Sequence, residues 1–303
     1  MTRWWAVAGL AGVVLLALLS LSRASQAAIT DGDEPRRRDG TDGLRAPERA
    51  PVDRRPRRAP AVVDRNASGK RPEASTVGRT TGLDAPERAP ALSDPAPGTT
   101  GAVPDAAAPS TWALLVNVAL TQGLFLVVLA GGLALFGVRP ADVGLGPTTR
   151  LHVAAGVALG AALYLASEAG GLAADRVGLG HDRRLRELLA PESPGGWAVL
   201  LLFVLPVIAG FEELLFRGVL IGALAAGFPV SPWLLAAVSS VAFGAGHGAQ
   251  GWAGVVVTGA LGFVLAAGFV LTDSLVAVVV AHYLVNALEF VVHEGFDIEW
   301  RGE

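Results

Sequence analysis

The chain has 303 residues, of which 52% are hydrophobic and 17% are charged, and its formal net charge is −3. The mean hydropathy of +0.49 is too high for a soluble globular protein. The apolar residues are grouped in runs of about twenty, the length that crosses a bilayer. The sequence shows no basic patch of the kind that binds nucleic acid. Because it contains no cysteine, disulfide bonds and thiolate metal sites are excluded.

The N-terminus combines Arg3 with the apolar run Trp4–Leu21. The small residues Ser25-Gln26-Ala27 that follow resemble a cleavage site. Residues 1–22 are therefore either a secretory signal peptide or an uncleaved membrane anchor. The length of the apolar run favours the anchor.

Residues 23–110 are rich in Pro, Arg, Asp and Ala and contain no aromatic residue. They also lack apolar periodicity. Such a segment buries too little surface to offset the entropy that is lost on ordering. We therefore expect a disordered linker here.

Residues 111–293 predict an all-α membrane domain, which is followed by a short acidic tail, 294–303. The apolar spans fall near 112–137, 151–174, 196–226, 233–248, 252–272 and 274–293. We therefore expect a polytopic transmembrane helical bundle of about six spans, embedded in the lipid bilayer of the cell membrane. The long third span contains Pro206 and Gly210, which are candidate break points.

The third span also contains the stretch Phe211-Glu212-Glu213-Leu214-Leu215-Phe216-Arg217-Gly218. Each charge in such a setting costs at least about 2.5–3.5 kcal/mol, so a function is the default hypothesis. Glu213 and Arg217 are four residues apart, lie on one helix face and can neutralise each other. Glu212 is rotated by about 100° from Glu213 and has no local counter-ion. An unpaired carboxylate in a low dielectric is suited to proton chemistry.

Two later spans carry further polar side chains. His247 ends the stretch Phe243-Gly244-Ala245-Gly246-His247, and the last span contains His282-Tyr283-Leu284-Val285-Asn286. A neutral imidazole and a carboxamide can both donate hydrogen bonds without bringing a charge into the membrane. The pKa of His247 is tunable near neutrality, so this ring can share a proton with Glu212. Together these groups could activate a water molecule and stabilise an oxyanion.

Three motifs, Glu212-Glu213-x-x-x-Arg217, Phe243-x-x-x-His247 and His282-x-x-x-Asn286, occur in this order. Together they resemble the CPBP family of intramembrane glutamic endopeptidases, the CAAX-protease and bacteriocin-processing group also called Abi. The resemblance covers roughly residues 112–293.

The resemblance implies a hydrolase that needs no cofactor and cleaves membrane-embedded or lipid-anchored polypeptides. It implies that Glu212 acts as general base with His247, while His282 and Asn286 bind the oxyanion. The remaining motif residues would support the site: Glu213, Arg217 and Phe243.

Other interpretations stay open. Two Glu and two His could bind Zn²⁺ by ligand type, although the spacing His-Glu-x-x-His is absent. The chain could also be a non-catalytic immunity or scaffold protein of the same fold, or a proton-coupled transporter. We leave two further carboxylates of the spans, Glu168 and Glu289, outside the predicted site.

Overall fold

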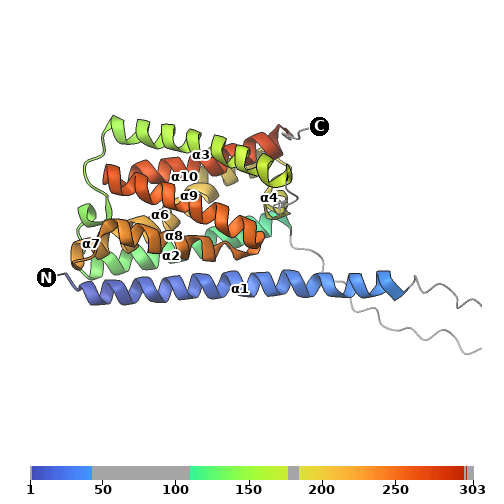
Figure 1. Cartoon of the computed structure of the whole chain (residues 1–303), viewed down its shortest axis with the longest axis horizontal. Helices are drawn as coiled ribbons and strands as arrows, with labels where there is room; N and C mark the ends of the chain where they lie inside the picture. Colours follow the sequence, from blue (N-terminus) through green and yellow to red (C-terminus); the bar gives the residue numbers. More distant parts are fainter. Residues whose placement is uncertain (1, 43–109, 177–183, 297, 299–303) are drawn as a thin grey trace, which may run out of the picture. The chain divides into compact units, whose positions relative to one another are not determined.

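The computed structural model describes residues 2–42, 110–176, 184–296 and 298 (Figure 1). These residues are predominantly helical and include no β-strand, so the all-α prediction is confirmed. Met1–Gly40 and Ala108–Glu303 form one compact unit. The second unit, Thr41–Ala107, lies almost entirely outside the described residues.

The α-helices are α1 Trp4–Asp42, α2 Thr111–Leu135, α3 Arg150–Arg176, α4 Arg184–Leu189, α5 Pro194–Val199, α6 Leu205–Glu213, α7 Leu224–Gly227, α8 Pro232–Gly246, α9 Gly251–Thr272 and α10 Leu275–Glu289. Short 3₁₀ segments cover Pro140–Val143 (η1) and Gly248–Gln250 (η4). Three π-helical segments cover Leu200–Val204 (η2), Leu214–Ala223 (η3) and Phe290–Gly295 (η5).

Within the described part of the chain, six helical segments are long and apolar enough to cross a membrane. They are Trp4–Ala24, Thr111–Leu135, Arg150–Ala173, Pro194–Gly227, Gly254–Thr272 and Leu275–Gly295. The predicted span 233–248 corresponds to α8, which has 15 residues. At ~1.5 Å per residue α8 is shorter than the ~30 Å of a bilayer core.

The third predicted span is a continuous helical stretch of 34 residues, Pro194–Gly227. The break considered at Pro206 or Gly210 is absent. The π-helical segment η2 ends just before Pro206, and a local π turn accommodates the missing N–H of a proline without ending the helix. All residues from Phe211 to Val219 are buried, so this stretch is the centre of the bundle.

Two glycines set how closely α10 lies against α3. A Cβ on Gly156 would clash with the carbonyl oxygen of Ala277, and one on Gly160 would lie 2.8 Å from that of Ala281. Small residues at such positions let two membrane helices approach closely. The residue after Ala281 is His282, so this packing positions one of the predicted site residues.

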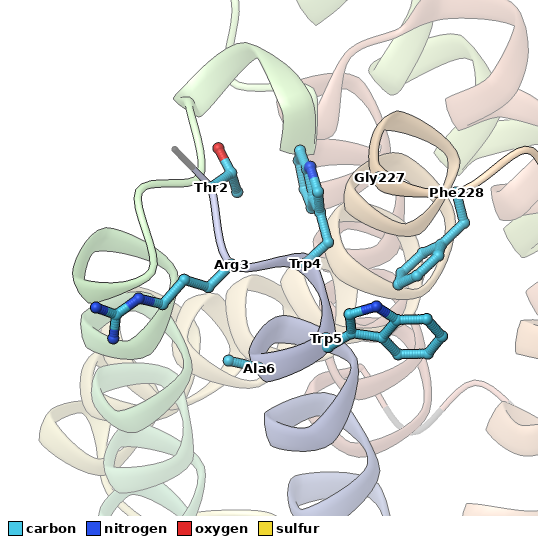
Figure 2. A pocket seen from close by; sticks show the side chains of 7 residues that line it. All are labelled: Thr2, Arg3, Trp4, Trp5, Ala6, Gly227 and Phe228. Atoms are coloured by element: carbon cyan, nitrogen blue, oxygen red, sulfur yellow. The ribbon is translucent and has the colours of Figure 1, made fainter.

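Helix α1 packs on the bundle with one face. Val7, Ala11 and Val14 are buried, whereas Trp5 and Leu16 are exposed. At its N-terminal end the Trp4 ring lies against Gly227, and Trp5 contacts the ring of Phe228 (Figure 2).

Helix α1 continues to Asp42. The N-terminal helix is therefore longer than the hydrophobic segment 1–22 that the sequence predicts. Helix propagation needs only one further hydrogen bond per residue once a helix has formed. The rest of the predicted linker, 43–109, lies outside the described residues.

Candidate active site

The ion pair predicted from the spacing of Glu213 and Arg217 is present. Nη1 of Arg217 donates to Oε1 of Glu213 over 2.7 Å, and both side chains are fully buried. Nη2 of Arg217 donates to the carbonyl oxygen of Gly262, also over 2.7 Å. The guanidinium carbon lies 4.7 Å from the centroid of the Phe243 ring. Arg217 therefore joins η3 to α8 and α9.

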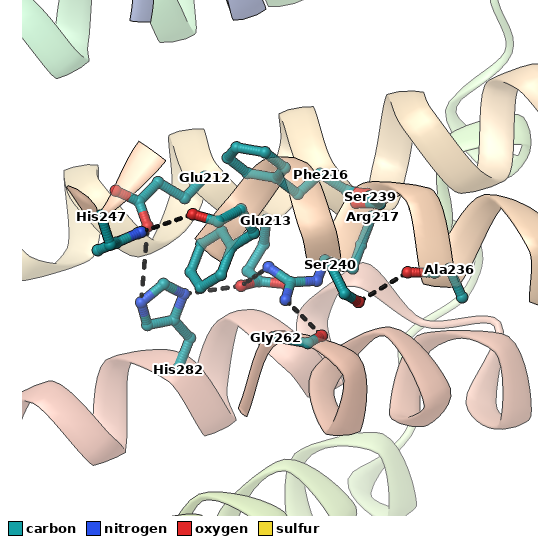
Figure 3. A network of polar contacts seen from close by, with 11 residues as sticks. Glu212, Glu213, Phe216, Arg217, Ala236, Ser239, Ser240, His247, Gly262 and His282 are labelled. Carbon is teal, nitrogen blue, oxygen red and sulfur yellow. Dashed lines mark hydrogen bonds and ion pairs between the residues drawn. The ribbon is translucent and has the colours of Figure 1, made fainter. Parts of the chain in front are cut away.

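His282 connects the two glutamates (Figure 3). Its Nδ1 lies 2.7 Å from Oε1 of Glu213. Its Nε2 lies 3.8 Å from Oε2 of Glu212, within ion-pair range but beyond hydrogen-bonding distance. Because a carboxylate only accepts hydrogen bonds, Nδ1 is protonated and donates its hydrogen bond to Glu213. The opposite nitrogen of the ring is thereby directed at Glu212.

His247 lies at the end of α8 and occupies its C-cap position. Its Nδ1 lies 2.8 Å from the carbonyl oxygen of Phe243, and its ring centroid lies 4.6 Å from that of Phe243. A carbonyl oxygen only accepts, so Nδ1 donates and Nε2 is the acceptor of the neutral ring. Among the described residues, the histidine nitrogen within ion-pair distance of Glu212 belongs to His282 and not to His247. The proposed sharing of a proton between His247 and Glu212 thus stays a prediction.

Asn286 lies one turn after His282 on α10 and is partly buried. Within the described part of the chain, its amide makes no side-chain hydrogen bond. The amide is therefore available to a ligand at the level of His282, and its role in binding an oxyanion remains a prediction.

The buried charges of the site consist of two carboxylates and one guanidinium. Glu212 and His282 are each 7% exposed, and Glu213 and Arg217 are 0% exposed. Oε2 of Glu213 and Nε of Arg217 are buried without a hydrogen-bond partner in the described structure. The pair is thus held through one atom of each group and not through the bidentate arrangement that strengthens such pairs.

Several contacts of the site were not predicted from the sequence. Arg217 lies in the π-helical segment η3, and Oγ of Ser239 donates to the Phe216 carbonyl oxygen of this segment over 2.6 Å. A serine in an apolar span is a sequence signal that could have indicated this contact. The carbonyl of Gly262 gives no sequence signal, because every residue carries one.

The carboxylates left out of the predicted site have other partners. Glu168 lies 2.7 Å from Nε2 of His293, and Ser167 donates to Glu289 over 3.3 Å. No cluster of three or more His, Asp or Glu side chains in the described residues could hold a metal ion. The zinc alternative thus gains no support from the described geometry.

A comparison with protein families matches residues 194–288 to the Rce1-like family, described as type II CAAX prenyl endopeptidase Rce1-like. The matched range runs from the start of α5 into α10 and contains every residue of the three motifs. Searches of curated proteins and of solved structures each found no match to the chain. The match over residues 194–288, which includes all three motifs, supports the resemblance of this part of the chain to CAAX-type membrane endopeptidases.

Proposed function

We propose that the protein is an intramembrane endopeptidase that uses Glu212 to activate a water molecule. The observation that carries this proposal is the buried chain of contacts from Glu212 through His282 and Glu213 to Arg217. It combines proton-transfer groups with a fixed cation inside an apolar bundle, and it lies within the range matched by the family. A purely structural ion pair does not need the second carboxylate or the histidine.

In the proposed reaction the water oxygen attacks the scissile carbonyl carbon while Glu212 takes the water proton. Glu212 then returns this proton to the amide nitrogen as the C–N bond breaks and the amine leaves, and Nε2 of His247 is an acceptor that can share the proton. Nε2 of His282 and the amide of Asn286 would donate to the oxyanion. Donation from Nε2 requires a protonated His282 ring. The negative charge of Glu213, which accepts the hydrogen bond from Nδ1, stabilises that ring.

The proposed substrates are membrane-embedded or lipid-anchored polypeptides. The family description names prenyl substrates for the family. The position of Glu212 in a buried membrane-length segment supports the broader class, since a substrate must reach this site from within or beside the bilayer.

The test compares the termini of membrane proteins in the native host between wild type and a chromosomal Glu212→Gln strain. Glutamine preserves the shape and removes the base, so wild-type termini should be replaced by longer forms, with a rate loss of about 10²–10⁴-fold. Glu192→Gln, an exposed loop carboxylate, is the matched control and should leave the termini unchanged. Identical termini in all three strains, at normal protein level, would contradict proteolysis and favour the scaffold function.

A further inference from the structure

Helix α1 lies outside the family match, yet one of its faces packs on the bundle. The buried residues Val7, Ala11 and Val14 are 0%, 1% and 3% exposed. Their spacing of four and three residues places them on one face. The Leu10 side chain occupies the space above Gly132 of α2 that a Cβ would need. The opposite face, with Trp5 81% and Val13 66% exposed, is suited to lipid.

Both ends of the apolar part of α1 are tied to the bundle by hydrogen bonds. At the start, Thr2 Oγ1 donates to the Gly137 carbonyl over 2.9 Å and the Arg3 amide to that of Phe136 over 3.0 Å. At the far end, Ser22 Oγ donates to the Gly246 carbonyl over 2.7 Å. These ties are about 30 Å apart along a helix with ~1.5 Å rise per residue. A cleaved signal peptide has no need of such fixed contacts at both ends.

The contact of Ser22 reaches the turn that carries His247. Gly246 is the last residue of α8, and the carbonyls of a helix's last turn have no partner within the helix. Ser22 satisfies one of them. The turn itself is rich in glycine, which gives its backbone more freedom than other residues would. The hydrogen bond from Ser22 therefore adds to the contacts that hold His247 in place, such as the bond between its Nδ1 and the Phe243 carbonyl oxygen.

We propose that α1 is retained in the mature protein as a packed helix of the protease domain, and that Ser22 is a positioning residue for His247. The second half of this proposal rests on the proposed function, because it assigns His247 a catalytic task. The first half rests on packing alone.

Retention is tested on the full-length protein purified from membranes. Its intact mass should include residues 1–24, and an N-terminus near residue 28 would overturn the proposal. The chain contains no native cysteine, so engineered pairs give a clean signal. Leu10→Cys with Gly132→Cys should form a disulfide under mild oxidation. Gly12→Cys with Gly132→Cys is the matched control, because a Cβ on Gly12 meets open space. Equal cross-linking of the two pairs would contradict the packing.

Positioning by Ser22 is tested first without relying on activity. His247→Cys serves as a reporter, and its labelling by a water-soluble maleimide is compared in chains with Ser22, Ser22→Ala and Ser22→Thr. Ser22→Ala should change the labelling rate about fivefold, the factor expected for losing one ordinary hydrogen bond, whereas Ser22→Thr should not. Ser20→Ala, on the exposed side of α1, should match wild type. Equal labelling in all four chains would overturn the positioning role.

The same Ser22 and Ser20 variants are then measured with native His247. Ser22→Ala should lower kcat about fivefold at unchanged KM, and Ser22→Thr should restore it. A raised KM with unchanged kcat would indicate a role in substrate binding and would overturn the positioning role. If the wild type cleaves nothing, the proposed function fails, while the mass, cross-linking and labelling results still decide the place of α1.

Discussion

Arg217 holds three elements together from a fully buried position, because it contacts Glu213, the Gly262 carbonyl and the Phe243 ring. Arg217→Ala leaves the Glu213 carboxylate buried with one partner fewer, which should cost about 3–5 kcal/mol of folding stability. The measurement is the fraction of folded protein and its thermal midpoint in detergent. Arg150→Ala, at an exposed position, is the control, and a shift no larger than that of the control would contradict this assignment.

Asn286 is expected to behave in the opposite way. Among the described residues its amide makes no hydrogen bond, so Asn286→Ala should leave the thermal midpoint within the range of ordinary surface changes. Loss of one oxyanion donor should nevertheless lower kcat by about 10²–10³-fold. The two values are measured on the same preparation. Wild-type kcat in the variant would exclude Asn286 from the oxyanion site.

Some contacts of the site could be predicted from the sequence and others could not. The difference lies in how far apart the two residues of each contact are along the chain. Glu213 and Arg217 pair within one helix, so their spacing alone predicts the contact. Glu213 and His282 are 69 positions apart, and only the packing of α10 against α6 brings them together. The same holds for Glu212, whose Oε2 lies 3.8 Å from Nε2 of His282, a residue far away along the chain.

At the scale of elements, the contact of α3 with α10 depends on the absence of side chains at its glycines. Gly160→Ala would bring a methyl group 2.8 Å from the Ala281 carbonyl oxygen, next to His282. Forcing the helices apart should destabilise the protein by about 1–3 kcal/mol and lower its activity. Gly170→Ala on the same helix meets open space and should be neutral. Equal thermal midpoints for the two variants would contradict the close approach.

The 3₁₀ segment η1 has an acid-sensitive cap. Asp142 accepts hydrogen bonds from the Arg139 side chain and backbone, and the side-chain bond lowers the pKa of the Asp142 carboxyl below its ordinary value of 3.8. A carboxyl whose pKa is lower in the folded state than in the unfolded state contributes to folding stability. This contribution is complete above the unfolded-state pKa and is lost as the pH falls through the folded-state pKa. This stability should therefore disappear only in strongly acidic solution.

The difference in thermal midpoint between wild type and Asp142→Asn measures this contribution. It should stay constant from about pH 7 to about pH 5 and vanish as the pH drops below the ordinary aspartate value. A difference that already fades between pH 7 and pH 5 would indicate that another group titrates instead. The cap lies outside the membrane-spanning segments, so detergent-solubilised protein is adequate.

The helices themselves were largely predictable, because hydropathy over about twenty residues decides whether a segment crosses a membrane. Local irregularities were not. The π-helical segments η2 and η3 leave no mark in hydropathy. The break considered at Pro206 or Gly210 does not occur, because the π turn of η2 accommodates the proline. The apolar run 233–248 exceeds the length of α8, Pro232–Gly246, by one residue only.

At the scale of the whole molecule, the order of the helices fixes which loops share a membrane side. The connection from α2 to α3 and the connection from α4 to α5 are separated by one crossing, α3. Thr148→Cys and Glu192→Cys, both at exposed positions, should therefore be labelled by an impermeant reagent from opposite sides of sealed vesicles. Labelling of both from one side would contradict the topology. The cysteine-free background makes each signal unambiguous.

The hydrogen bond from Ser22 to Gly246 also indicates how deep in the membrane the turn that bears His247 lies. Ser22 directly follows the apolar run of α1 and precedes Arg23, so it lies where the hydrocarbon ends and water begins. The turn bearing His247 must lie at that same boundary. Under the proposed function, water then reaches the site from the adjacent aqueous phase without crossing lipid. A polypeptide cut at the margin of the bilayer yields two unlike products: one that keeps its membrane anchor, and one that is shed from the surface.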